Sequence, residues 1–332
     1  MLPKSESPGR ILCLLGMCLA FAGIGTGHLS QYFIVFDVFS HFTLHFAIAA
    51  IACGWAFLMP KHRLVSAVAM MLAGMLAIGL WPNLEERVLP PRGGVEAPEG
   101  YRELRVMSFN SWLMNRDTEA IRAQIELQDP DVVFIAEVNR LTLAMARSLN
   151  EQYPYQYPSV VSPGFRLWIM SRYPLREVVA RGPWLGPVFL RASLGPQWGN
   201  LTIVGTHTIR PPAVNAQWKQ INALAKYVRE IPEPRLLMGD FNATPYSRMT
   251  RQFAAVTGLT LRSQLPTWPS NSWRLPQIAI DHMFADESLL FPQGVQVGHA
   301  SGSDHLPIMA RILVPVPGRS AGLQQQQEEA AQ

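Results

Sequence analysis

Hydrophobic residues dominate the first 82 positions of this 332-residue chain, where long apolar stretches follow one another closely. Only three charged residues fall between positions 11 and 82. Stretches 42–59 and 64–81 each contain 18 residues without Asp, Glu, Lys or Arg, and a helix of this length spans about 27 Å at about 1.5 Å per residue. Both stretches predict transmembrane helices, within a membrane anchor that covers residues 1–82.

A third apolar stretch, residues 11–27, has two interpretations. It contains 17 uncharged residues, follows Lys4 and Arg10, and includes an Ala-Phe-Ala sequence at 20–22, a pattern that also suits a cleavable signal peptide. Because further membrane helices follow it, we favour an uncleaved helix. The anchor is thus expected to contain two or three transmembrane helices.

Basic residues in the short loops predict how the anchor is oriented. Lys61 and Arg63 lie between two predicted helices, and such residues remain preferentially on the cytoplasmic side. The chain after Trp81 then emerges outside the cytoplasm, whether or not the first stretch is cleaved. The sequence therefore predicts a multi-pass protein of the inner (cell) membrane with a large extracytoplasmic domain, periplasmic in a bacterial-type cell.

Three polar residues near the second predicted helix, Asp37, His41 and His45, are spaced four apart. On one continuous helix they would share a face, which is the geometry of a proton relay or a metal site. The alternative is that they lie at the membrane interface before the span begins, and we favour this alternative. We call these three residues the polar stripe.

Composition divides the rest of the chain into a linker, a domain and a tail. Four prolines and three glycines between positions 82 and 100 predict an extended linker over residues 83–102. Residues 317–332 include four consecutive glutamines and few apolar side chains, so we expect this tail to be disordered. The soluble domain is then 103–316, which is long enough for one sizeable core.

Short apolar runs rich in β-branched residues recur through this domain and are bounded by Pro, Gly, Asn or Asp, which predicts strands. The runs are 105–109, 132–136, 167–170, 188–194, 201–205, 236–239, 278–284 and 308–314. Helical periodicity is present at 118–128 and 213–229. Many strands with few long helices predict stacked sheets with helices outside.

Polar residues follow several of these strands at the point where each ends. Asp240 and Asn242 follow one buried run, where a carboxylate could accept a proton from a water that the amide orients, although the same residues are common in simple β-turns. Asp281 precedes the Asp304-His305 pair in the chain, and a second carboxylate of this kind can hold an imidazole charged and oriented.

Other strand ends carry residues that could bind a cation or an anion. Glu137 follows the run 132–136, where it is either solvated or positioned to hold a hard cation. Asn110 and His207 follow two further runs in the same way. A rigid scaffold can aim such strand-end side chains into one cleft.

Taken in order, these motifs resemble the endonuclease/exonuclease/phosphatase superfamily, which has the DNase I-like fold. The motifs are Ser108-Phe109-Asn110, Ala136-Glu137, Gly205-Thr206-His207, Gly239-Asp240-Phe241-Asn242, Ile280-Asp281-His282 and Ser303-Asp304-His305. The resemblance implies an α/β fold, a four-layered sandwich, that hydrolyses phosphate esters with a divalent metal.

The resemblance also implies a role for each motif residue. Glu137 would be the principal metal ligand, with Asn110 and Asp304 nearby. Asp240 would activate the water and Asn242 would position it. Hydrogen bonds to the phosphate would come from His207 and from His305 oriented by Asp281.

The donor types agree with such a site, because carboxylates and amides without any thiolate suit Mg²⁺ or Mn²⁺ better than a tetrahedral zinc site. Two positions depart from the family pattern. Trp112 stands where many relatives have a second polar residue, and His207 stands where abasic-site endonucleases generally have Tyr. The departure at His207 argues against that repair branch, and the departure at Trp112 argues against a second metal position or a direct substrate contact there.

The substrate stays open at this point. A nuclease-like phosphodiesterase acting on nucleic acid is the leading hypothesis, although the net charge of +4 is mild and only Arg166, Arg172 and Arg210 suggest phosphate contacts. A phospholipid or inositol-phosphate headgroup hydrolase at the bilayer is the alternative. A hypothesis of another class is a non-enzymatic membrane binding protein with a degenerate sandwich, in which the polar stripe carries the function.

The predicted orientation can be tested with reporter fusions after Gly100. An alkaline-phosphatase fusion should be active, because this enzyme folds only outside the cytoplasm, whereas a fluorescent-protein fusion that requires the cytoplasm should be dark. An inactive alkaline-phosphatase fusion together with a fluorescent fluorescent-protein fusion would show that the orientation is the reverse of the predicted one.

Overall fold

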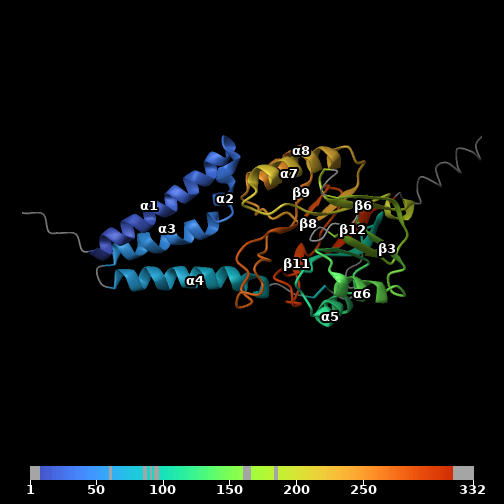
Figure 1. The fold of residues 1–332 in the computed structure, drawn as a ribbon, viewed down its shortest axis with the longest axis horizontal. Coiled ribbons are helices and arrows are strands. Elements are labelled where there is room, and N and C mark those ends of the chain that lie inside the picture. The colour runs from blue at the N-terminus through green and yellow to red at the C-terminus, as the bar shows by residue number, and fades with distance from the viewer. Residues whose placement is uncertain are drawn as a thin grey trace, which may run out of the picture.

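The computed structural model describes residues 8–59, 62–84, 88–89, 92, 97–159, 166–182 and 186–316. Figure 1 shows the long helices near the N-terminus extending from one side of a domain built of sheets and helices. Part of the predicted linker (85–87, 90–91 and 93–96) and the whole predicted tail, 317–332, lie outside the described residues.

The extension is built of α1 (Pro8–His28), α3 (Thr43–Leu58) and α4 (Arg63–Leu84). Two segments, Pro8–Gln31 and Arg63–Pro82, are long and apolar enough to cross a membrane. The third possible span is bent by 56° between Ile34–Ser40 and Thr43–Leu58. Two helices, or three if the bent pair is one span, therefore meet the length and composition of transmembrane segments.

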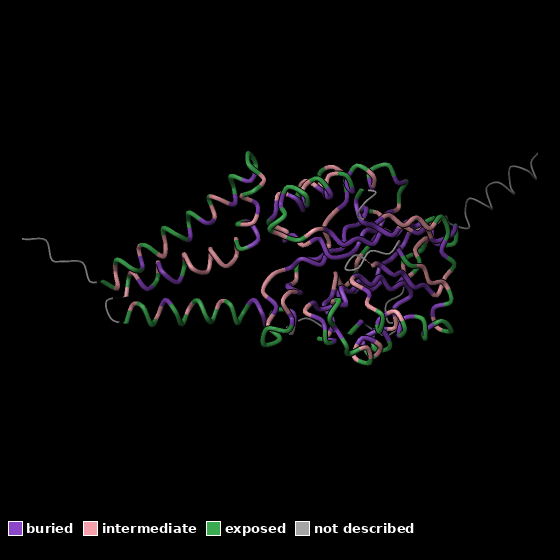
Figure 2. The backbone as a smooth tube through the Cα atoms, viewed as in Figure 1, coloured by how far each residue is buried: buried purple, intermediate pink, exposed green. Residues whose placement is uncertain are grey.

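Small residues allow the three helices to pack closely. A Cβ at Gly16 would lie 2.7 Å from the sulfur of Cys53, and one at Gly74 would lie 2.6 Å from Ile48. Close approach of this kind is typical of helix packing in membranes. Many residues of α1 and α4 are exposed (Figure 2). They include large apolar residues such as Leu19, which is 71 % exposed.

The domain contains two six-stranded sheets. The first sheet has the strand order β11-β12-β1-β2-β4-β3. Its strands are β1 (Tyr101–Asn110), β2 (Val132–Ala136), β3 (Tyr155–Pro158), β4 (Trp168–Ser171), β11 (Val295–Val297) and β12 (Ile308–Pro315). Only β1 and β2 pair in parallel within it among the described strands.

The second sheet repeats this plan with the strand order β5-β6-β7-β8-β10-β9. Its strands are β5 (Leu175–Arg181), β6 (Phe189–Leu194), β7 (Thr202–His207), β8 (Arg235–Asp240), β9 (Thr260–Leu261) and β10 (Asp281–Ala285). Here β7 and β8 form the parallel pair. Each parallel pair is joined by a helix, as a parallel connection requires.

Four layers result from the alternation of side chains along the strands. In β2, Val132 and Phe134 face the other sheet, whereas Val133 and Ile135 face helices. The helices α5 (Thr118–Gln128) and α6 (Arg140–Ser148) cover the first sheet, and α7 (Val214–Arg229) and α8 (Arg248–Thr257) cover the second. Figure 1 shows these helix pairs on opposite sides of the strands, which confirms the predicted sandwich.

Several elements were not predicted from the sequence. These are the helices α6 and α8 and the strands β3, β5, β9 and β11. The strands are short or partly exposed, so they lack a continuous apolar run. For α8 a signal was present, because Ser247 caps the helix by accepting a hydrogen bond from the Met249 N–H, and Met249 and Phe253 lie on one buried stripe.

The polar stripe connects the helical extension to the domain. Asp37 is fully buried and accepts hydrogen bonds from the hydroxyl of Ser247 and, at 2.7 Å, from the backbone N–H of Arg248. His41 Nδ1 lies 3.2 Å from the backbone nitrogen of Thr244, which donates to it. The stripe therefore docks the bent segment onto the start of α8, a role that the sequence analysis did not consider.

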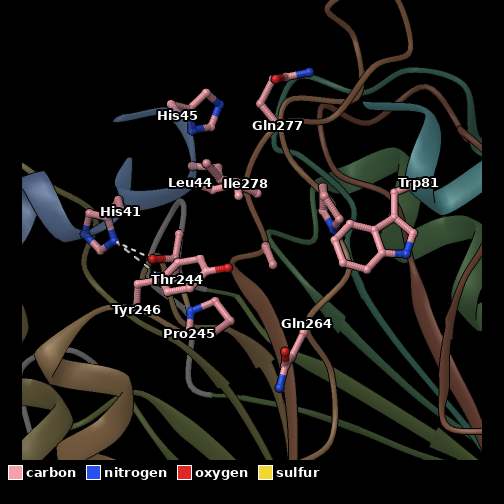
Figure 3. A pocket seen from close by; sticks show the side chains of 12 residues that line it. His41, Leu44, His45, Trp81, Thr244, Pro245, Tyr246, Gln264, Gln277 and Ile278 are labelled. Carbon is pink, nitrogen blue, oxygen red and sulfur yellow. Dashed lines mark hydrogen bonds between the residues drawn. The ribbon is translucent and has the colours of Figure 1, made fainter. Parts of the chain in front are cut away.

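Further contacts join α4 to the domain. Gln277 donates from Nε2 to the Met75 carbonyl oxygen at 3.2 Å, and a Cβ at Gly79 would lie 2.6 Å from that of Leu275. Figure 3 shows the small pocket that remains at this junction, with Trp81 on one side and His41 and Thr244 on the other. The domain thus rests directly on one end of the helices.

Replacing Asp37 by Ala should lower the melting temperature of the detergent-purified protein. The substitution leaves the Arg248 N–H and the Ser247 hydroxyl without their acceptor, and each lost buried hydrogen bond of this kind costs about 1–3 kcal/mol. Asp37→Asn, which keeps one acceptor oxygen, should lose less. Thermal unfolding followed by tryptophan fluorescence measures both, and an Asp37→Ala protein that melts like the wild type would contradict this docking role.

Candidate active site

The ends of four strands meet at one edge of the sandwich. Asn110 is the last residue of β1, Glu137 follows β2, and His207 and Asp240 end β7 and β8. Because β1 pairs with β2 and β7 with β8 in parallel, the carboxyl ends within each pair point the same way. The strand-end residues predicted from the sequence are thereby brought together.

Backbone geometry fixes the position of Asp240. Gly239 has φ +143°, and a Cβ there would lie 1.9 Å from the Thr206 carbonyl oxygen, so only glycine fits. Glu137 and Asn242 also adopt positive φ, at 53° and 48°. Non-glycine residues in this conformation are uncommon and concentrate at functional sites.

Asn110 lies at the centre of the cluster. Its Nδ2 donates to Glu137 Oε1 at 3.1 Å and to Asp240 Oδ2 at 3.0 Å, and it lies 3.4 Å from His305 Nε2. One amide therefore connects a carboxylate of the first sheet with a carboxylate of the second.

Two imidazoles flank the same carboxylates. His207 Nε2 lies 3.5 Å from Glu137 Oε1 and 3.6 Å from Asp240 Oδ2. His305 Nε2 lies 3.8 Å from the same Asp240 oxygen. Two histidines therefore lie close to Asp240 Oδ2, and Asp240 Oδ1 accepts a 2.7 Å hydrogen bond from the backbone N–H of Asn242.

The buried carboxylate of Asp281 orients His305. The Asp281 Oδ2 atom lies 2.8 Å from His305 Nδ1 and also accepts a 2.6 Å hydrogen bond from the Thr267 hydroxyl. Burial by itself would lower the pKa of His305, but the charges of Asp281, Asp240 and Asp304 outweigh burial and raise this pKa to about 10. His305 is therefore a charged imidazolium at neutral pH.

The environment of Asp240 disfavours its charged form. Its burial and the nearby charge of Asp281 raise its pKa, against the lowering effect of His305 and His207, to about 6. A carboxylate with a pKa close to neutrality is a good general base, because it is deprotonated at neutral pH and still accepts a proton readily.

A cleft of about 450 Å³ opens over this cluster. It is lined by Trp112, Leu113, Met114, Glu137, His207, Thr208, Ile209, Arg210, Asp240, Asn242, Trp268, Asp304 and His305. The volume is within the range of about 300–1,000 Å³ typical of ligand sites. Asp281 lies behind the cleft, where it supports His305.

The donor set suits a hard divalent cation. Among the described residues, two groups of His, Asp and Glu place their ligand atoms within 4.8 Å of one another: Glu137 with His207 and Asp240, and Asp240 with Asp281 and His305. Asp304 belongs to neither group, but its buried Oδ1 has no hydrogen-bond partner in the described structure. Carboxylate oxygens without partners are expected where a cation binds.

Some residues of the cleft were not found by sequence analysis. Trp268 donates from Nε1 to Asp304 Oδ2 at 3.1 Å, and Thr267 holds Asp281. Both lie on an irregular segment before β10, which carries no periodic signal. Of the three arginines considered, Arg210 lines the cleft, whereas Arg172 forms an ion pair with Asp129.

This fold and this cleft define the class of DNase I-like, metal-dependent phosphoester hydrolases. The model of the Endonuclease/Exonuclease/phosphatase family matches residues 107–305, and the chain belongs to this family. It is therefore an enzyme, a phosphoric ester hydrolase of the endonuclease/exonuclease/phosphatase type. The hypothesis of a non-enzymatic protein with a degenerate sandwich is wrong.

Solved structures with the same fold include proteins that act on different substrates. An endonuclease/exonuclease/phosphatase from Beutenbergia cavernae is 22 % identical, with a TM-score of 0.52 over 65 % of this chain and 72 % of that one. Sphingomyelinase C from Streptomyces griseocarneus is 18 % identical (TM-score 0.51, 63 % and 99 % covered).

A third similar structure is the 3′ phosphatase NExo from Neisseria, bound to a product DNA hairpin. It is 17 % identical, with a TM-score of 0.52 over 62 % of this chain and 98 % of that one. A comparison with curated protein sequences found no match. At these identities the likeness establishes the fold and leaves the substrate undecided.

A third histidine, His282, supports the cleft from behind. It is fully buried on β10, its Nε2 lies 2.8 Å from the Ala243 carbonyl oxygen, and its Nδ1 lies 3.4 Å from the Ser263 hydroxyl. Burial lowers the pKa of His282 to about 4, from an ordinary value of 6.5. The folded protein therefore holds this imidazole neutral.

We expect His282 to make the protein less stable in mild acid. Between pH 6.5 and pH 4 the unfolded chain binds the proton more readily, so this stabilisation is complete above pH 6.5 and is lost as pH falls toward 4. From pH 7 to pH 5 the loss is about 2 kcal/mol, or a few degrees of melting temperature.

Melting curves of the wild type and of His282→Gln at several pH values measure this contribution. The variant should show a flatter dependence on pH, whatever its absolute stability, whereas His28→Gln, at an exposed histidine, should retain the wild-type slope. Equal slopes for the wild type and His282→Gln would show that His282 does not titrate in this way.

Proposed function

We propose that this protein is a membrane-anchored, divalent-metal-dependent phosphodiesterase. The observation that carries the proposal is a cluster in which neighbouring polar atoms lie 3.0 to 3.8 Å apart. Its members are Asn110, Glu137, His207, Asp240 and His305. The cleft thus combines the buried base Asp240, the imidazolium of His305 and the carboxylate of Asp304, whose Oδ1 has no hydrogen-bond partner among the described residues. Hydrolysis of a phosphate ester requires groups of these kinds.

Asp240 is the general base in this proposal. Its carboxylate accepts a proton from a water molecule, and Asn242, whose Nδ2 lies 3.2 Å from Asp240 Oδ2, positions that water beside it. The resulting nucleophile attacks phosphorus in line with the leaving oxygen. The raised pKa of Asp240 supports this role, because the base must take up a proton during the step.

His305 and His207 bind the non-bridging phosphate oxygens. The charge on His305, maintained by Asp281, offsets the repulsion between the anionic ester and the nucleophile and stabilises the charge that develops in the transition state. Among the described residues, the Asp281 carboxylate bonds to His305 and Thr267 and does not line the cleft, so it acts as a positioning residue.

A Mg²⁺ or Mn²⁺ ion would be held by Glu137 and Asp304, with Asn110 beside them. When bound, it supplies a Lewis acid that neutralises the phosphate oxygens. The amide nitrogen of Asn110 faces the two carboxylates in the structure, so its oxygen would ligate a metal only after the amide turns. Glu137 and Asp304 would still offer carboxylate oxygens, which are the ligands that these ions prefer.

The helical extension is proposed to anchor the enzyme as a multi-pass protein, with the catalytic domain on the extracytoplasmic side of the inner membrane. The length and apolar surface of α1 and α4 support the anchoring, and Lys61 and Arg63 support the orientation. Either a nucleic acid or a lipid headgroup could supply the phosphodiester at that position.

Substitution of the proposed base and of the proposed imidazolium should abolish most activity on bis-p-nitrophenyl phosphate. Asp240→Asn and His305→Gln should each lower kcat by about 10²-fold or more, since general acid–base and charge stabilisation each contribute about 10²–10⁴-fold. Glu119→Gln, at a carboxylate whose side chain is 82 % exposed outside the cleft, is the matched control and should retain the wild-type rate.

The metal requirement is tested in the same assay. Treatment of the purified full-length protein with EDTA should remove the activity, and Mg²⁺ or Mn²⁺ should restore it. Rates that are the same in all variants, with and without chelator, would refute the catalytic assignment.

A further inference from the structure

A second cavity, of about 420 Å³, lies between the bent membrane segment and the catalytic domain. The bent segment contributes Val38, Phe42 and the buried His41, while the domain contributes two prolines and two isoleucines from the segments beside β7 and β10. These four residues are Pro211, Pro212, Ile278 and Ile280. We call this space the apolar cavity. It is large enough for a ligand and is lined mainly by side chains that exclude water.

The apolar cavity adjoins the catalytic cleft. Arg210, Asn242 and Trp268 line both spaces. Asn242 is the proposed water-positioning residue, so the apolar cavity begins beside the reacting phosphorus. A ligand that fills both spaces needs an anionic group next to an apolar chain, and the Arg210 guanidinium between them carries the charge that complements a phosphate.

We propose that the apolar cavity binds the alkyl chain of a membrane lipid while the phosphodiester of the same molecule occupies the catalytic cleft. The substrate class is then an amphiphilic phosphodiester taken from the bilayer. This inference rests on the proposed function, since it assigns a substrate to the same cleft.

Exposed apolar side chains place the apolar cavity at the level of the bilayer surface. Around the bend, Tyr32 and Phe33 are 70 % and 63 % exposed, and Phe42, which lines the cavity, is 43 % exposed. Trp273 is 93 % exposed and lies in the loop that contacts α4 through Leu275 and Gln277. Aromatic residues at the ends of membrane helices are typical of the lipid–water interface. A lipid could therefore enter the cavity without leaving the membrane.

A polynucleotide fits the two spaces less well. Each nucleotide carries a charged phosphate and a polar sugar, and burying such groups against Val38, Phe42 and Ile280 without partners would be costly. Arg210 is the basic residue that lines both spaces, whereas nucleic-acid binding generally relies on many phosphate contacts. The lining of the cavity thus favours a single phosphate with an apolar chain.

The test compares two phosphodiesters that have the same p-nitrophenyl leaving group, one with an ethyl and one with a hexadecyl chain. Both are presented to the full-length protein in mixed micelles at the same mole fraction. Since each buried CH₂ is worth about 0.8 kcal/mol, the wild type should hydrolyse the hexadecyl ester with a kcat/KM at least about tenfold higher.

Two variants change the apolar cavity in opposite directions. Val38→Trp fills it and Phe42→Ala opens it to water, so each should lower kcat/KM for the hexadecyl ester about tenfold or more while the ethyl ester is hydrolysed as by the wild type. Val35→Trp, at a neighbouring valine that is 55 % exposed and is not among the residues that line the cavity, is the matched control. It should preserve the chain-length preference.

Binding of a non-hydrolysable hexadecyl phosphonate, measured by calorimetry, separates this inference from the proposed function. If the phosphonate binds tightly, Val38→Trp weakens this binding and neither ester is hydrolysed, the apolar cavity is a lipid site but the protein is not a phosphodiesterase. Metal-dependent hydrolysis without a chain-length preference, or with an oligonucleotide preferred over both esters, would keep the phosphodiesterase and overturn the lipid site.

Discussion

The catalytic cleft depends on the buried contact between His305 and Asp281. Burial disfavours the charged imidazole, and the charge of Asp281 is the largest of the contributions that oppose burial and raise the pKa of His305. A neutral imidazole could not offset the charge of a phosphate. With the carboxylate in place, His305 stays charged beside Asp240, whose own pKa is raised by burial and by Asp281. Asp281 thereby raises the pKa of two neighbouring groups, His305, the proposed anion-binding imidazolium, and Asp240, the proposed base.

The sandwich explains why these groups can be held so closely. Two parallel strand pairs, β1 with β2 and β7 with β8, place their carboxyl ends at the same edge, and the core between the sheets fixes their separation. Gly205 and Gly239 show how tight this arrangement is, because a Cβ at Gly205 would lie 2.1 Å from the Phe134 ring of the opposite sheet. The absence of side chains at these two positions permits the close approach.

The helical extension contacts the domain close to the cleft. Asp37 and His41 bind the segment between Thr244 and Arg248, which begins two residues after Asn242. A polar stripe that would be costly in a bilayer is therefore satisfied by the catalytic domain. The bent segment also lines the apolar cavity beside the cleft, so in the proposed function its position influences which phosphate ester binds.

The sequence by itself determined the apolar helices, most of the long strands, the helix at 118–128 and the set of strand-end residues, because each of these signals is local in the chain. It left α6, α8 and the short strands unpredicted, since their stability comes from packing against the sheets. Only the tertiary structure decided that Asp37 caps the start of α8, that Trp268 and Thr267 support the cleft, and that an apolar cavity adjoins it. These contacts join residues up to 211 positions apart, and no local pattern specifies which distant groups will satisfy one another's hydrogen bonds and charges.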